Sequence, residues 1–257
     1  MVSRVIANQT DYVYSLAYDY RDSYLYVPRH SHSDIVRFQY PNNQTVMFER
    51  VVQTNAPIAI TFDSTNRHLY WTEDGPYETI FRCDADGSNK TLIRSANNPS
   101  ALTLDIVNRW IYFGEQRFNG QINRLTFDGK ELTVIINNRT TNVFGIAVDV
   151  PRSRIYWMEC GSGDLKSAYY NGSDINTVVK TNQIGRNWGI AISDDLIFYA
   201  SGNQILKINK SSGQNATVVH SDTNQIYGVV FLKQEGKCYC LVLSTLQIYE
   251  NDNYLKE

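Results

Sequence analysis

One short pattern recurs along the chain at nearly constant spacing, and it limits the folds that this sequence can adopt. In each unit an Asp stands six positions before an aliphatic residue, which is followed by a mostly aromatic pair. The four anchor residues are Asp19, Asp63, Asp105 and Asp149, which lie 44, 42 and 44 residues apart. Two weaker units follow, within residues 189–200 and 228–243. A period of this length indicates an architecture of stacked repeats, each one supersecondary unit.

Each unit contains four strand-like segments of about 4–6 residues. A small-apolar run such as ALTL or GIAV comes first, the aromatic run second, an alternating segment third and a β-branched run fourth. Tight-turn pairs stand between the third and fourth segments, at Asp86-Gly87, Asp128-Gly129 and Asn171-Gly172. Four antiparallel strands repeating about every 43 residues indicate the blade of a β-propeller.

Counting the units predicts an all-β, six-bladed β-propeller of four-stranded antiparallel blades, with residues 1–257 as one domain. The sixth unit ends after its third strand, while the chain begins with the β-branched run VSRVIA at residues 2–7. We therefore expect the N-terminal strand at about residues 2–7 to complete the sixth blade, because closure removes an open sheet edge.

The segments RHLYWTEDG (67–75), RWIYFGE (109–115) and SRIYWME (153–159) resemble the YWTD repeat, also called the LDL-receptor class B repeat. The resemblance covers nearly the whole chain and implies a six-bladed propeller of the kind found in lipoprotein receptors, Wnt co-receptors and nidogens. It also implies a protein ligand bound across one face. The chain departs from the family pattern at Ser23 and Ser153, which replace an Arg, and at Arg29 and Ser201, which replace an acid.

The composition is that of an ordinary globular protein, with 42% hydrophobic and 19% charged residues. A net charge of −2 gives no basis for binding nucleic acid, and no apolar run approaches the ~18–20 residues of a membrane span. The N-terminus lacks the apolar region of a signal peptide. The chain is thus either cytosolic or a mature or recombinant segment of an exported protein.

The loop into each first strand and the loop after each second strand open on one face, because strand direction alternates. Small residues four positions before each anchor suit close packing round a central channel. One position earlier lie Tyr14, Ile58, Ser100, Phe144, Trp188 and Tyr227, of which four are aromatic. They form either an apolar plug or, as we favour, a platform for a partner, since exposed aromatic clusters are typical hot spots.

We expect the same face to receive three acidic side chains from consecutive blades, Glu73, Glu115 and Glu159, and the basic side chain of Arg29 from the blade before them. An apolar centre beside an acidic arc would suit a protein or peptide loop that carries Lys, Arg or Asn. The predicted partner-binding residues are Tyr14, Arg29, Ile58, Glu73, Glu115, Phe144, Glu159, Trp188 and Tyr227.

Seven Asn-X-Ser/Thr triplets exceed the roughly three expected by chance, and they favour an extracellular glycoprotein. Most fall in or beside the turns joining third and fourth strands, on the face opposite the aromatic residues. These are Asn43, Asn89, Asn171, Asn209 and Asn215; Asn8 and Asn138 are placed in loops on the aromatic side.

The aromatic residues of the second strands are expected to pack between neighbouring blades. These are Tyr70, Trp71, Tyr112, Tyr156 and Trp157. No His stands near a plausible nucleophile, Gly-X-Ser-X-Gly is absent, and no Cys/His spacing matches a zinc site. The sequence therefore predicts no catalytic residue, no metal and no cofactor.

The leading prediction is an extracellular, non-enzymatic recognition module for a protein or peptide ligand, either secreted or part of a receptor. One alternative is a secreted lectin with sugar sites between blades, which the 18 Tyr residues leave open. Another is a calcium-dependent lactonase or esterase, for which Asn98, Asn142, Asn187 and Asn224 stand near the mouth. The apolar ring argues against this enzyme, since calcium prefers several convergent oxygens.

Overall fold

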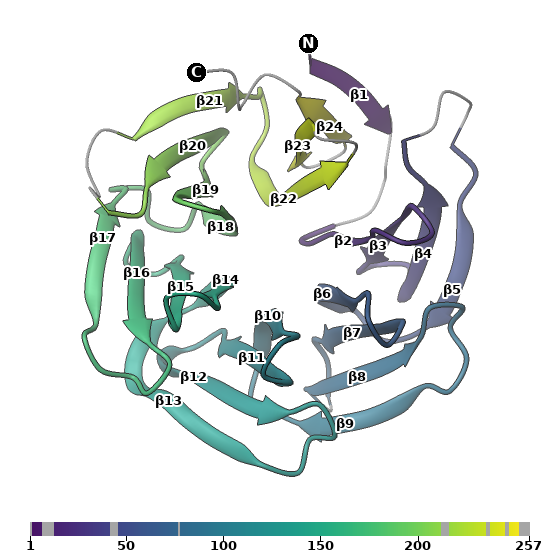
Figure 1. Cartoon of the computed structure of the whole chain (residues 1–257), viewed down its shortest axis with the longest axis horizontal. Helices are drawn as coiled ribbons and strands as arrows, with labels where there is room; N and C mark the ends of the chain where they lie inside the picture. Colours follow the sequence, from purple (N-terminus) through teal and green to yellow (C-terminus); the bar gives the residue numbers. More distant parts are fainter. Residues whose placement is uncertain are drawn as a thin grey trace.

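The computed structural model describes residues 2–6, 13–41, 46–76, 78–211, 216–234, 237–244 and 247–251, with side chains from 13–230 within these ranges. All regular elements in this part of the chain are β-strands. No helix there is long and apolar enough to cross a membrane. The strands form four-stranded antiparallel sheets arranged round a central axis, with the first strand of each repeat innermost (Figure 1).

Five sheets are blades, each made of four consecutive strands in chain order. Blade 1 contains β2 (Ala17–Asp19), β3 (Tyr24–Arg29), β4 (Asp34–Gln39) and β5 (Glu49–Gln53). Blade 2 contains β6 (Pro57–Asp63), β7 (His68–Glu73), β8 (Thr79–Asp84) and β9 (Thr91–Ser95). Blade 3 contains β10 (Pro99–Asp105), β11 (Trp110–Glu115), β12 (Phe118–Thr126) and β13 (Leu132–Thr141). Blade 4 contains β14 (Val143–Asp149), β15 (Arg154–Glu159), β16 (Asp164–Tyr169) and β17 (Asn176–Lys180). Blade 5 contains β18 (Asn187–Ser193), β19 (Leu196–Ser201), β20 (Gln204–Asn209) and β21 (Thr217–Ser221).

The two ends of the chain meet in a further sheet, which we call the terminal sheet. Its strands are β22 (Ile226–Gln234), β23 (Lys237–Ser244), β24 (Gln247–Asn251) and β1 (Val2–Ile6), hydrogen-bonded in that order. β1 pairs antiparallel with β24 and is the outer strand of this sheet.

The prediction of a six-bladed propeller is wrong and is corrected to five blades, although the N-terminal strand does join the strands of the last unit, as β1 on β24. The five blades follow the repeat, whereas the terminal sheet joins strands from opposite ends of the chain and is not a sixth blade of the same kind. Its sequence also lacks the repeat's anchor, since Leu232 occupies the position of the Asp. The buried anchor carboxylates of blades 1–4 therefore have no counterpart in that unit, as they have none in blade 5, whose first strand ends at Ser193.

The turns between third and fourth strands have the predicted backbone. Gly87, Gly129 and Gly172 adopt φ of 89°, 74° and 79°, values that favour glycine. These glycines also touch the preceding blade: a Cβ on Gly129 would lie 2.2 Å from the carbonyl oxygen of Ile93. Glycine at this position therefore permits both the turn and the close contact between blades.

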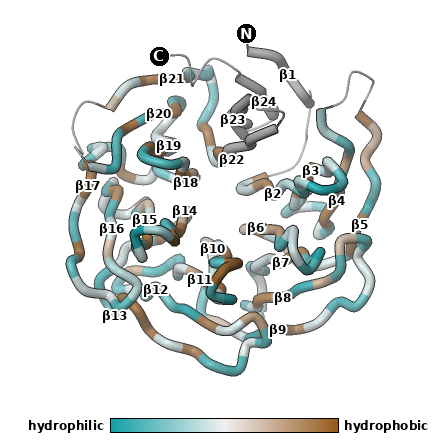
Figure 2. Tube along the Cα trace, in the orientation of Figure 1, coloured by the Kyte–Doolittle hydropathy of each residue, from teal (hydrophilic) through white to brown (hydrophobic). Residues whose placement is uncertain are grey.

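The hydrophobic core lies between blades rather than within one of them. Tyr26 of blade 1 packs in one cluster with Leu69 and Trp71 of blade 2, and Tyr112 of blade 3 packs with Trp157 of blade 4. Figure 2 shows hydrophobic segments on the inner strands, while the connecting turns are mostly hydrophilic. The prediction that the second-strand aromatic residues are structural is confirmed: Tyr70, Trp71, Tyr112, Tyr156 and Trp157 are all buried.

The anchor Asp residues connect successive blades. Asp63 is fully buried and accepts a hydrogen bond of 2.8 Å from Arg109 of blade 3. In the same way Arg67 of blade 2 pairs with Asp19 of blade 1. Each Arg therefore reaches the Asp of the preceding unit, a partner that the repeat pattern did not identify.

Candidate functional site

The four aromatic side chains predicted at the channel mouth meet in one cluster, which we call the aromatic mouth: Tyr14, Phe144, Trp188 and Tyr227. Trp188 lies at its centre. Its ring stacks on Tyr14, with centroids 5.5 Å apart and planes inclined by 12°, and lies 4.1 Å from the ring of Phe144. Tyr227 meets Trp188 edge to face at 4.9 Å. All four side chains are half-buried, so part of each remains accessible.

The other two members of the predicted ring do not belong to this cluster. Ile58 and Ser100 are 6% and 2% exposed, although both belong to the lining of the central cavity described below. The hydroxyl of Ser100 donates a hydrogen bond to the carbonyl oxygen of Val143 in the next blade. These two side chains are therefore occupied by blade packing and offer little surface to a ligand.

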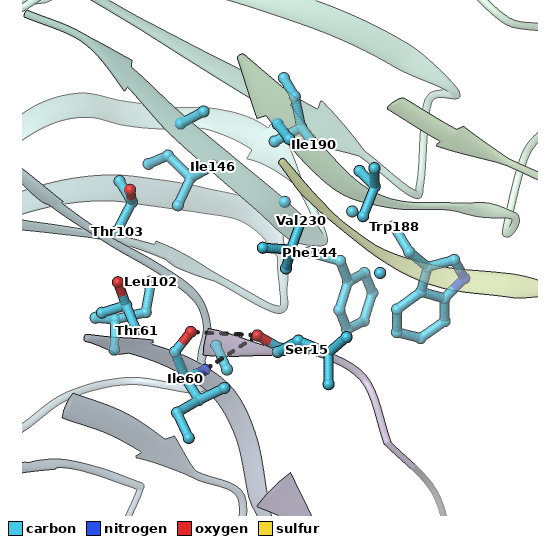
Figure 3. Close-up of a pocket in the computed structure, with 18 of the residues that line it drawn as sticks. Ser15, Ile60, Thr61, Leu102, Thr103, Phe144, Ile146, Trp188, Ile190 and Val230 are labelled. Atoms are coloured by element: carbon cyan, nitrogen blue, oxygen red, sulfur yellow. Dashed lines mark hydrogen bonds between the residues drawn. The ribbon is translucent and has the colours of Figure 1, made fainter. Parts of the chain in front are cut away.

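The aromatic mouth borders a cavity of about 330 Å³ among the inner strands. Figure 3 shows Phe144 and Trp188 at one side of this cavity and aliphatic side chains such as Ile146 and Ile190 around it. Hydroxyl groups enter the lining at Thr61 and Thr103, which occupy equivalent positions on β6 and β10. Sequence reasoning did not single out these Thr residues, although their shared place in AITF and ALTL was the available signal.

Two polar side chains near the mouth, Ser15 and Asn187, are already hydrogen-bonded, whereas the indole Nε1 of Trp188 is buried without a partner in the described part of the chain. Ser15 accepts a hydrogen bond of 3.1 Å from the backbone N–H of Ile60 and donates one to its carbonyl oxygen. Asn187, named above as an oxygen ligand for calcium, is buried; its Oδ1 accepts from Thr181 and its Nδ2 donates to Gln183. Among the described residues, no group of three or more His, Cys, Asp or Glu side chains is placed to hold a metal ion.

The predicted acidic arc is not at the surface, which corrects the interpretation of all three glutamates. Glu73, Glu115 and Glu159 are 4%, 4% and 1% exposed. Glu159 accepts hydrogen bonds of 3.0 Å from the indole Nε1 of Trp157 and 2.9 Å from Lys166. The reason is the strand periodicity: the Trp two residues earlier points to the same side, and its buried N–H requires an acceptor.

Glu73 is bound in the same manner as Glu159. It accepts a hydrogen bond of 3.1 Å from Nε1 of Trp71 and one from the hydroxyl of Thr54, and the ammonium of Lys90 lies 3.5 Å away. Both carboxylates therefore stabilise their own blades and are not available to an external partner.

Glu115 keeps the buried position but has a weaker set of partners. It accepts a hydrogen bond of 3.1 Å from the backbone N–H of Gln121, and the Nε of Arg117 lies 3.5 Å from its Oε2. Burial raises the pKa of Glu115, an effect that Arg117 partly opposes. Because the pKa of Glu115 is higher in the folded than in the unfolded protein, its contribution to stability falls as the pH rises from the unfolded pKa to the folded one.

Arg29, predicted to contact a partner, is paired within its own blade. Its Nε and one terminal nitrogen donate hydrogen bonds of 2.8 and 2.6 Å to the two carboxylate oxygens of Asp34. Asp34 is 4% exposed, so the ion pair joins the ends of β3 and β4. This bidentate geometry commits the guanidinium to a structural role.

The described sequon residues are all exposed: Asn89, Asn138, Asn171 and Asn209. Asn89 and Asn171 lie between third and fourth strands, and Asn209 is the last residue of β20. Asn138 lies within β13 rather than in a loop, because the third and fourth strands of blade 3 pair for longer than those of the other blades. The remaining sequons, at Asn8, Asn43 and Asn215, lie outside the described residues.

Solved structures with this architecture include both binding proteins and enzymes. A nidogen/laminin complex has a chain that matches with a TM-score of 0.76 at 16% identity, over 84% of this chain and 83% of that one. A gluconolactonase from Xanthomonas campestris matches with a TM-score of 0.81 at 14% identity, over 97% and 88% of the chains. A luciferin-regenerating enzyme matches with a TM-score of 0.74 at 13% identity, over 97% and 94%. No family model matches the chain.

These matches identify the fold as a β-propeller. They also overturn the prediction that the protein is not an enzyme, because two of these propellers are enzymes that match 97% of the chain. The physical reason is that a propeller can support a reaction with only a few side chains at its channel, and the repeat pattern reports on blade packing rather than on those side chains.

Proposed function

We propose that the chain is a YWTD-type propeller that binds a protein or peptide ligand at the aromatic mouth. The observation that carries this proposal is the position of Trp188, half-buried at the centre of four packed rings beside a cavity. Clustered Trp and Tyr side chains provide a large contact area at a low cost in conformational entropy. The nidogen/laminin complex among the similar structures supports a protein as the partner.

The lining of the cavity indicates which part of the partner would enter it. At about 330 Å³ the cavity is near the lower end of ligand pockets, which span about 300–1,000 Å³. Its described lining is aliphatic and aromatic with hydroxyl groups, and no charged side chain belongs to it. We therefore expect one apolar or aromatic side chain of a partner loop to be inserted, and not the basic one that an acidic arc would have favoured.

Replacing Trp188 with Ala is expected to weaken peptide binding about 30-fold, or about 2 kcal/mol, as for a central hot-spot residue. The measurement is the Kd of peptides selected from a displayed random library on the wild-type protein. Val107→Ala is the matched control, since Val107 is an apolar side chain, 76% exposed, in the β10–β11 turn on the opposite face. Equal affinities of the selected peptides for the wild type and for Trp188→Ala would contradict the proposal.

We further propose that the protein acts outside the cell as a glycoprotein. The support is the excess of sequons and the exposure of Asn89, Asn171 and Asn209 in or beside turns distant from the aromatic mouth. Protein from its native source should then lose mass on enzymatic removal of N-glycans. An unchanged mass would contradict this assignment.

The second candidate is hydrolysis of a lactone or ester in the same cavity, which the gluconolactonase match favours. The hydroxyl groups of Thr61 and Thr103 would then orient a polar substrate. The test is the rate of gluconolactone hydrolysis above the spontaneous rate, with and without calcium. A protein-dependent rate that falls at least about tenfold in Thr61→Val would favour the enzyme, whereas no rate above the spontaneous one would exclude this substrate.

A further inference from the structure

The strand register allows equivalent positions in neighbouring blades to be compared directly. On the second strands, Trp71 of blade 2, Phe113 of blade 3 and Trp157 of blade 4 are equivalent, and each precedes a buried Glu by two residues. They face Phe81, Asn123 and Lys166, respectively, on the third strands. The three blades therefore contain the same carboxylate in three different surroundings.

Blades 2 and 4 both satisfy the carboxylate with an indole N–H and an ammonium group. In blade 4 the ammonium belongs to Lys166 of the third strand, 2.9 Å from Glu159. In blade 2 it belongs to Lys90, which immediately precedes the fourth strand and also lies 4.5 Å from the ring centroid of Phe81. The two Lys residues therefore belong to different parts of their blades, but their ammonium groups contact glutamates at equivalent positions.

Blade 3 lacks each of these donors while it keeps the carboxylate. Phe113 replaces the Trp and has no N–H. Leu132 stands where blade 2 has Lys90, because Thr91 and Thr133 pair with equivalent Arg residues of the third strands. Asn123 stands where blade 4 has its Lys, and its Nδ2 is 3.5 Å from Glu115. Ala96, three residues before the first strand, replaces Thr54 of blade 2.

The missing side chains leave a cavity between blades 2 and 3. Its volume is about 360 Å³, and its walls include Ala96, Phe113, Glu115, Asn123 and Leu132, the carboxylate and the four substituted positions together. Arg94 also lines it, but the Nη1 of that guanidinium donates a hydrogen bond of 3.1 Å to the carbonyl oxygen of Gly129, in the β12–β13 turn. The buried Glu115, which the Nε of Arg117 approaches to 3.5 Å, is therefore the carboxylate that this cavity offers to a cation.

We propose that this cavity binds a primary ammonium group on a short aliphatic chain, as presented by the lysine side chain of a partner protein. The ammonium donates to Glu115 as Lys90 and Lys166 do to their own glutamates, and the methylene groups lie against Phe113 and Leu132. Such a ligand supplies an ammonium donor beside Arg117, whose Nε lies 3.5 Å from Glu115, and the apolar volume that blade 3 lacks. This site is separate from the aromatic mouth, and it requires no particular ligand there.

The test is a titration of the wild-type protein with n-butylammonium chloride, followed by the amide NMR signal of Gln121, whose N–H contacts Glu115. We expect a saturable shift with n-butylammonium and none with n-butanol at the same concentration and ionic strength. Glu115→Gln should abolish the shift. An equal response to butanol, or a response that survives Glu115→Gln, would overturn the proposal, as would saturation by glucose in place of the amine.

A second variant keeps the proposal testable without removing the carboxylate. Leu132→Lys should place an internal ammonium in the cavity, as Lys90 does in blade 2, and so prevent n-butylammonium from binding. It should also raise the melting temperature by about 2–4 °C, because the buried carboxylate gains a charged donor. Thr133→Lys is the matched control, since the adjacent strand residue points to the other side. Undiminished butylammonium binding by Leu132→Lys would overturn the proposal.

Discussion

Replacing Asp63 with Ala is expected to lower the free energy of unfolding by about 3 kcal/mol, through loss of several hydrogen bonds to one buried charged group. The carboxylate is fully buried and accepts from the backbone N–H groups of Thr65 and Asn66, from Nδ2 of Asn66 and from Arg109. The Ala variant leaves these donors without their acceptor. It also removes the ion pair that joins Asp63 of blade 2 to Arg109 of blade 3. The measurement is urea denaturation at pH 7.

The matched control is Asp74→Ala, which removes an Asp whose side chain is 52% exposed and whose ion-pair contact is a 3.9 Å approach to His30. This variant should stay within about 0.5 kcal/mol of the wild type. An equal loss in the two variants would show that the effect comes from net charge and not from the buried network.

The contribution of Asp63 should also depend on pH. Burial by itself would raise the pKa of Asp63, but hydrogen bonds from Asn66, Arg109 and Thr65 outweigh it and lower the pKa below its usual value. A depressed folded pKa gives stability that is present above the unfolded pKa of about 3.9 and is lost as pH falls through the folded one. The difference in stability between wild type and Asp63→Asn should therefore shrink on acidification below about pH 4.

Replacing Gly145 with Val is expected to cost about 3 kcal/mol, at the upper end of the range for overpacking. A Cβ at this position on β14 would lie 2.2 Å from the carbonyl oxygen of Trp188 and 3.1 Å from the backbone nitrogen of Ile190, on β18 of the next blade. Because the obstructing atoms are backbone, no rotamer change can relieve the contact. The inner strands of blades 4 and 5 would have to move apart.

The same variant should disturb the aromatic mouth, since Trp188 lies on the strand that moves. We expect a changed near-ultraviolet circular dichroism signal and weaker binding of the selected peptides, together with a lower midpoint of denaturation. Gly75→Ala is the control, because a Cβ there would meet nothing within 4 Å. A Gly145→Val protein as stable as the wild type would contradict the packing described for the inner strands.

The position of the aromatic mouth could be predicted because it follows from counting back from each anchor Asp. Four of the six side chains at that position do meet. Ile58 and Ser100 could not be separated from them in advance, because burial in the wall depends on the neighbouring strands. The Thr61 and Thr103 hydroxyls were missed because a single Thr in an apolar strand carries no signal until its orientation is known.

The glutamates show the limit of counting most clearly. Their shared position after the aromatic pair indicated exposed acids, yet all three are buried, and Glu73 and Glu159 accept a hydrogen bond from the Trp two residues earlier. A closer comparison of the repeats offers a signal that was not used: Phe113 stands between the units of Trp71 and Trp157, and the Glu two residues later is unchanged in all three. The consequence, a cavity at Glu115, required the side chains of two blades in their places.

The sequence by itself determined the local features of this protein: strands of repeated pattern, glycine turns with positive φ, and aromatic second strands that pack between blades. These depend on backbone conformation and on burial of apolar surface, both of which have a short period along the chain. Only the tertiary structure decided which Asp each Arg reaches and which carboxylates are satisfied. The Arg–Asp pairs join groups more than 40 residues apart, and the glutamates take partners from several strands, so both outcomes depend on packing in three dimensions.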